Sequence, residues 1–95
     1  MARRPASVDR ARVRGQELVV GLGREARLGR VDRGLSQDDV AAALGVDRSW
    51  VSRVERGRMD DVGLVAMSEL LAAVGLELSA RAYPAAGPVR TGGAW

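Results

Sequence analysis

The chain has 95 residues and carries fifteen basic and twelve acidic side chains, a net charge of +3, with no cysteine and no histidine. This length suits one small domain, whose core is only marginally stable without disulfides, a metal or a partner subunit. Without cysteine there are no disulfides or thiolate metal sites, and without histidine the usual zinc ligand and general base are missing. We therefore expect no enzyme, no catalytic residue, no metal site and no cofactor.

The positive charge is concentrated at the front of the chain. Every basic residue is arginine, which is best explained by a GC-rich genome. Residues 1–34 hold nine arginines against four acidic residues, a net +5, whereas residues 35–57 and 58–95 each carry −1. A basic segment suits a polyanionic partner. No apolar stretch approaches the roughly 20 residues of a membrane span, and no apolar core of a signal peptide follows the N-terminus. These features predict a cytoplasmic protein.

The first elements in chain order are an arm and a helix. Residues 1–14 are rich in arginine and are expected to form a flexible basic arm, either without regular structure or helical toward its end. Leu18, Leu22 and Ala26 follow at intervals of four residues, which predicts an amphipathic helix from about residue 16 to 33.

Two short helices should follow, separated by Gly45. Ser36 can cap the first of them, about 37–44, together with Asp39 three residues later. Asp47 can cap the second, which continues to about residue 56. Side chains expected to point inward from this region are Val40, Ala41, Leu44, Val46, Val51 and Val54.

The last elements are a helix, a strand and a tail. Asp60 or Asp61 can cap a helix of about 62–74, whose apolar positions are Leu64, Met67, Leu70, Leu71 and Val74. Apolar and polar residues then alternate over 76–83, which predicts a strand. A lone strand is marginal, so it should pair either with its copy in a second subunit or with a partner protein. The Pro, Gly and Ala composition of residues 84–95 predicts a disordered tail.

The segment 36–57 holds two short helices joined at a glycine, and it carries a linked set of residues that resembles a known family. This set is Arg30, Gly34-Leu35-Ser36-Gln37, Ala41, Leu44-Gly45-Val46 and Val51-Ser52-Arg53-Val54-Glu55-Arg56-Gly57. It resembles the Xre/Cro/C1-type helix-turn-helix family of repressors over about residues 18–76. The resemblance implies an all-α, lambda-repressor-like bundle of four to five helices with a helix-turn-helix at 36–57 and, here, a short C-terminal strand. The DNA-binding domain would span residues 15–83.

The resemblance also implies roles for particular residues. Arg30 and Glu55, 25 positions apart, match a partly buried salt bridge between the first and third helices. The helix of about 47–56 would lie in the major groove with its outward side chains at base edges. The residues expected to read bases are Arg48, Ser49, Ser52 and Arg53.

Other residues are expected to contact the DNA backbone. Gln37 matches a family position that holds a phosphate, while Arg56 and Arg58 lie at and beyond the end of the recognition helix. Trp50 either presses on the sugar–phosphate backbone or a thymine methyl, or packs against the first helix or a dimer mate. In the arm, Arg10, Arg12 and Arg14 follow phosphates, reach into the adjacent minor groove or only improve solubility.

Two other patterns are rejected as sites. Residues 21–26 fit G-x-G-x-x-A, but no strand precedes them and the chain is too short for a dinucleotide-binding domain. The adjacent aspartates at 38–39 and 60–61 stand at expected helix starts, where capping explains them.

The leading hypothesis is a sequence-specific transcriptional regulator, a repressor that binds a palindromic operator in double-stranded DNA as a homodimer. The alternative is the antitoxin of a toxin–antitoxin pair, because residues 47–52, 63–65 and 75–78 resemble HipB-type antitoxins, which bind a toxin and regulate their own operon. A third hypothesis is a truncated regulator whose second domain once followed Pro84.

Overall fold

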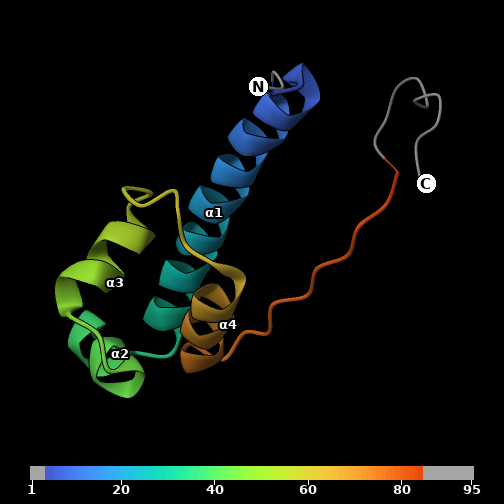
Figure 1. Cartoon of the computed structure of the whole chain (residues 1–95). Coiled ribbons are helices and arrows are strands. Elements are labelled where there is room, and N and C mark those ends of the chain that lie inside the picture. The colour runs from blue at the N-terminus through green and yellow to red at the C-terminus, as the bar shows by residue number, and fades with distance from the viewer. Residues whose placement is uncertain (1–3, 85–95) are drawn as a thin grey trace.

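The computed structural model describes residues 4–84, which form four helices (Figure 1). These are α1 (Ala6–Asp32), α2 (Gln37–Leu44), α3 (Arg48–Glu55) and α4 (Leu64–Ala73). The expected helical class is therefore confirmed for this part of the chain, with four helices. None of the described helices is both long and apolar enough to cross a membrane.

The three short helices gather around the C-terminal half of α1 (Figure 1). The core between them consists of small and medium-sized aliphatic side chains and one methionine. Its buried members are Ala26, Val40, Ala41, Val51, Val54, Met67, Leu70, Leu71 and Val74. A close approach of α1 to α3 is part of this packing, because a methyl group on Gly23 would overlap the carbonyl oxygen of Val54. A side chain at position 23 would therefore push the two helices apart.

The first helix is longer than the sequence pattern indicates. Residues 6–14, expected as an arm, form the first turns of α1 and project beyond the other helices (Figure 1). Alanine and arginine are good helix formers. Pro5 stands at the N-cap, and Asp9 in the first turn suits the positive end of the helix dipole and pairs with Arg4 at 2.9 Å. Local preferences of this kind extend the helix where the density of arginine suggested an arm.

The strand expected at 76–83 is not formed in the described chain, where residues 76–84 are extended but pair with no strand. The physical reason is that a strand needs a neighbour for its backbone hydrogen bonds, and the other described elements are helices. In Figure 1 this segment runs away from the end of α4. Of the tail expected at 84–95, residues 85–95 lie outside the described part, as do residues 1–3.

Three side chains expected inside are exposed, namely Leu18, Val46 and Leu64, and Leu18 on α1 is 50% exposed. Val46 is 37% exposed because it stands in the turn between α2 and α3. Leu64 is 65% exposed because it is the first residue of α4, where positions 63–65 all face solvent. The expected aspartate cap of α4 is also wrong: its N-cap is Gly63, with no side-chain cap bond. The N-cap of α3 is Asp47 as expected by position, but its side chain makes no capping bond.

Candidate nucleic-acid interface

A reciprocal pair of hydrogen bonds sets the start of α2. The backbone N–H of Asp39 donates to Ser36 Oγ at 2.9 Å, and the backbone N–H of Ser36 donates to Asp39 Oδ2 at 2.8 Å. This capping box satisfies amides that a helix start leaves without partners. The two bonds with Ser36 lower the pKa of the Asp39 carboxyl below its ordinary value.

The turn between α2 and α3 depends on Gly45. Its φ of 69° lies in the left-handed region, which a residue with a Cβ enters only at a cost. The amide of Val46 then donates to the carbonyl oxygen of Ala41 at 3.0 Å, which closes the end of α2. The chain is thereby redirected within three residues, and α3 begins at Arg48 packed against α2.

The eight-residue helix α3 has one buried side and one solvent-facing side. Val51, Val54 and Glu55 are buried. The other side presents two hydroxyls and two guanidinium groups at spacings of three and four residues, a single stripe along the helix. Its members are Ser49, Ser52, Arg53 and Arg56, of which Ser52 is half-buried and the others are exposed. Two arginines and two serines on a solvent-facing helix are suited to donate hydrogen bonds to the acceptors of base edges and phosphates.

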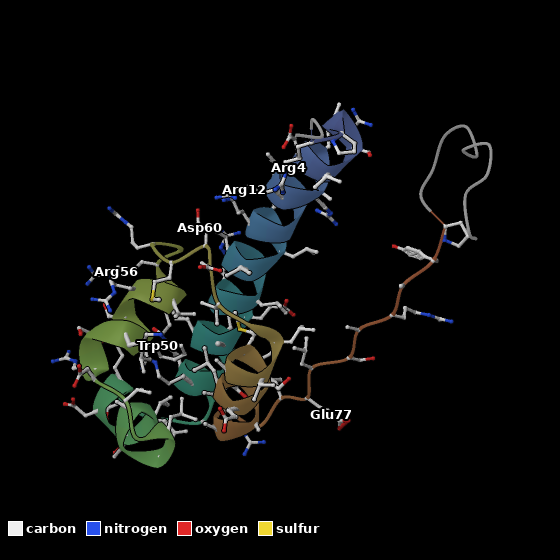
Figure 2. The ribbon with its side chains drawn as sticks, in the orientation of Figure 1. Arg4, Arg12, Trp50, Arg56, Asp60 and Glu77 are labelled. Carbon is white, nitrogen blue, oxygen red and sulfur yellow. The ribbon has the colours of Figure 1, made fainter. Side chains whose placement is uncertain are left out.

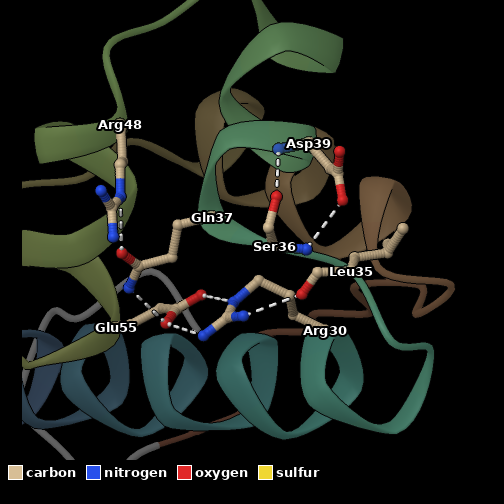
Figure 3. A network of polar contacts seen from close by, with 7 residues as sticks. All are labelled: Arg30, Leu35, Ser36, Gln37, Asp39, Arg48 and Glu55. Carbon is tan, nitrogen blue, oxygen red and sulfur yellow. Dashed lines mark hydrogen bonds and ion pairs between the residues drawn. The ribbon is translucent and has the colours of Figure 1, made fainter.

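A buried ion pair fixes α3 against α1 (Figure 3). Arg30 Nε donates to Glu55 Oε2 at 2.6 Å, and Arg30 Nη2 donates to Glu55 Oε1 at 3.0 Å. The side chains of Arg30 and Glu55 are 13% and 2% exposed. The partly buried salt bridge expected between these two residues is therefore confirmed. The hydrogen bond with Glu55 raises the pKa of Arg30, while burial acts in the opposite direction. Arg30 Nη1 also donates to the carbonyl oxygen of Leu35 at 2.9 Å, and so fastens the segment between α1 and α2.

The same pair is linked to the start of α3 through Gln37. Gln37 Nε2 donates to Glu55 Oε1 at 3.1 Å, and Arg48 Nε donates to Gln37 Oε1 at 3.4 Å (Figure 3). Arg48 Nε also lies 4.0 Å from Asp38 Oδ1, with both side chains exposed. The long, exposed contacts to Arg48 are weak and leave its guanidinium able to turn toward a ligand. The side chain of Gln37 is thus held in one orientation by its hydrogen bond to Glu55.

Trp50 is half-buried and packs against the hydrophobic core, and Figure 2 shows it on α3. Of the two expectations for this residue, the geometry favours packing. An indole in this position stiffens α3 and leaves only part of the ring for an outside contact.

The remaining residues that were expected to contact the DNA backbone lie on α1 and in the segment after α3. Arg10, Arg12 and Arg14 are exposed on the projecting part of α1, where Arg14 lies 3.7 Å from Glu17. Arg58 is exposed directly after α3, and its amide donates to the carbonyl oxygen of Arg53 at 2.8 Å. In Figure 2, Arg12 lies part-way along the projecting half of α1, while Arg56 lies on the far side of α3. The projecting arginines are therefore separate from the stripe on α3.

The comparisons with known proteins agree with this geometry. A family model described as a helix-turn-helix domain matches residues 21–83, which include α2, the turn and α3. The chain belongs to the helix-turn-helix domain family. It is also 39% identical over 61 residues to a protein of Neisseria meningitidis serogroup B (strain ATCC BAA-335 / MC58) named "Neisseria hypothetical transcription factor". That alignment covers 64% of this chain and 57% of the relative. No solved structure matches significantly.

The sequence pattern predicted which side of α3 faces solvent and predicted the pair of Arg30 with Glu55, but it did not predict the contacts of Gln37. The exposed side of α3 follows from the apolar spacing of Val51 and Val54. The link from Glu55 through Gln37 to Arg48 could not be predicted in this way. An amide side chain can donate to and accept from many partners, and its position in the sequence does not reveal which partner it takes. Among the described residues, no cluster of acidic side chains is arranged as a metal site.

Proposed function

We propose that this helix-turn-helix protein is a sequence-specific DNA-binding transcriptional regulator of the Xre/Cro/C1 type, a repressor that binds a palindromic operator as a homodimer. The observation that carries this proposal is the stripe of Ser49, Ser52, Arg53 and Arg56 on the solvent side of α3. The similarity to a protein named as a transcription factor supports the same function.

In this mechanism α3 enters the major groove and its outward side chains read base edges. Arg48 and Arg53 each have the planar fork that donates two hydrogen bonds to O6 and N7 of guanine, while Ser49 and Ser52 adapt to several bases. Each bidentate arginine contact is worth about 1–3 kcal/mol of discrimination against a wrong base. The reading of sequence is thus assigned to α3.

Backbone contacts would set the position of α3 in the groove. Arg56 and Arg58 at the end of α3 and Gln37 at the start of α2 would contact phosphates. Gln37 would do so while Glu55 holds its amide, so the buried ion pair also orients a phosphate contact. The bulk of Trp50 packs inside, and only its exposed edge would touch the sugar–phosphate backbone.

The arginines of projecting α1 would add affinity without sequence preference. Replacing Arg10, Arg12 and Arg14 together by glutamine should weaken binding to all duplexes. The salt dependence, as the slope of log K against log salt, should fall by about 0.9 for each phosphate that the variant no longer neutralises. An unchanged slope would assign these arginines to solubility instead.

The experiment that tests the function is in vitro selection of double-stranded DNA from a random library by the full chain. We expect a two-fold symmetric motif whose half-sites lie about one helical turn, roughly 34 Å, apart. Enrichment of no motif would contradict sequence-specific binding.

A second candidate function, the antitoxin, is favoured by the extended segment 76–84. Leu76 and Tyr83 are 40% and 74% exposed, and the backbone between them is extended and outside the helices. Such a segment can add as a strand to a sheet of a partner protein or to its own copy. Co-expression with the product of a neighbouring gene tests this candidate: an antitoxin relieves that product's toxicity and co-purifies with it, and a repressor alone does neither.

A further inference from the structure

The side of α1 that faces away from the core carries an apolar stripe. Its aliphatic members are Val13, Val20, Leu28 and Val31, of which Val13 is 54%, Leu28 61% and Val31 55% exposed. Glu17 and Arg24 stand between them at the same spacing of three and four residues, so all six lie along one line of the helix. A surface helix ordinarily places polar residues on its solvent side, and this stripe departs from that rule.

The middle of the stripe is hollowed. A groove of about 370 Å³ lies there, and on α1 it is lined by Val13, Glu17, Val20, Gly21 and Arg24. The other wall comes from Gly57 and Asp60 in the segment that follows α3. Nothing lies within 4 Å of the position that a Cβ of Gly21 would take, so the helix surface at Gly21 is open to a close approach.

The charges on the stripe are arranged symmetrically about its centre. Glu17 and Arg24 lie equally far from the midpoint between Val20 and Gly21. In an antiparallel pair of α1 helices centred on that midpoint, Glu17 of each copy stands opposite Arg24 of the other, and Val13 stands opposite Leu28. A two-fold interface requires such self-complementarity, since the same patch must fit itself.

We propose that this face of α1 binds a second copy of the chain, antiparallel and two-fold symmetric, with two reciprocal Glu17–Arg24 ion pairs around an apolar centre. This interface deepens the homodimer of the proposed function and rests on that part of it. The contact of Glu17 with Arg14 of its own helix, 3.7 Å long and exposed, is weak enough to be exchanged for the intermolecular pair.

A second copy fits this face better than DNA does. Glu17 and Asp60 would repel phosphates on both walls of the groove, and aliphatic side chains gain nothing from a polyanion. The opposite charges on one stripe instead match a partner with the same two charges in reversed order.

Charge reversal and charge swap test this interface on the full chain, with mass measured by sedimentation over a wide range of concentration. Glu17→Arg and Arg24→Glu should each raise the dimer dissociation constant about tenfold or more, because like charges then face each other. The double variant Glu17→Arg/Arg24→Glu should restore dimerisation, because the pairs are re-formed with exchanged signs. Glu25→Arg makes the same charge change as Glu17→Arg at an exposed position off the stripe and should leave the mass unchanged.

Circular dichroism confirms that each variant is folded, and binding to a duplex with a single half-site reports DNA recognition separately from dimerisation. Any one of four results would overturn this interface. The wild-type chain stays monomeric, the single variants dimerise normally, a control variant also dissociates, or the double variant stays monomeric. Loss of half-site binding by a dimeric wild-type chain would contradict the proposed DNA binding and leave the interface standing.

Discussion

The buried ion pair between α1 and α3 makes a prediction about stability that is separate from DNA contact. In Glu55→Ala the guanidinium of Arg30 loses two charge-assisted hydrogen bonds, at 2.6 and 3.0 Å, and keeps only the bond to Leu35. Gln37 loses its acceptor as well. Since Arg30 is only 13% exposed, water replaces little of what is removed.

The cost of breaking such a pair on one side is about 3–5 kcal/mol. A domain of this size is stabilised by roughly 5–15 kcal/mol, and 1 kcal/mol corresponds to about 4–8 °C in the melting temperature. Glu55→Ala should therefore lower the melting temperature by about 12 °C or more. Thermal unfolding followed by circular dichroism gives the value. Glu69→Ala, at an exposed position of α4, is the matched control and should change stability by less than about 0.5 kcal/mol.

A second pair of variants separates charge burial from helix packing. Replacing both partners by apolar residues, Arg30→Met with Glu55→Leu, leaves no uncompensated charge and should recover much of the lost stability. If Glu55→Ala melts like the wild type, the ion pair does not fix the orientation of α3, and this reasoning is refuted.

Three further predictions concern the local structure. Ser36→Ala removes one half of the capping box and should cost about 1 kcal/mol in urea unfolding, and an unchanged midpoint would contradict the cap. Gly23→Ala should destabilise the domain, because the added methyl meets the carbonyl of Val54. Gly15→Ala, with open space around it, should instead stabilise α1 by up to about 1 kcal/mol. If both variants change the free energy of unfolding in the same direction, the close approach of α1 and α3 is contradicted. Because the pKa of Asp39 is lowered, its contribution to stability is fully present above the ordinary value of 3.8 and is lost as the pH falls through the lowered pKa. The difference in melting temperature between wild type and Asp39→Asn should therefore vanish in strong acid. A difference that persists there would count against the cap.

The helix-turn-helix itself could be predicted from the sequence because its signals are local. Ser36 and Asp39 form the cap that their spacing indicates, Gly45 takes the left-handed conformation, and Val51 and Val54 are buried. Each of these features depends on residues at most four positions apart, where steric and hydrogen-bonding preferences act directly.

The parts that were not predicted depend on contacts distant in sequence or on the absence of a partner. Residues 76–83 have the alternation of a strand, but a strand requires a neighbour that this chain does not offer among its described residues. Leu64 has helical spacing with the core residues of α4, yet it precedes the region where α4 is covered. Likewise, Asp60 follows the pattern of a cap and instead lines the groove beside α1. In each case the local pattern is present in the sequence, but the tertiary surroundings prevent the structure that the pattern predicts.

Arg53→Ala decides whether the exposed side of α3 reads bases. Once a duplex has been selected, its affinity and that of every single-base variant are measured for the wild type and for Arg53→Ala. We expect Arg53→Ala to lose about 1–3 kcal/mol of discrimination at one base pair of each half-site, with preferences elsewhere and the melting temperature unchanged. A uniform weakening at every position, or full retention of all preferences, would contradict it.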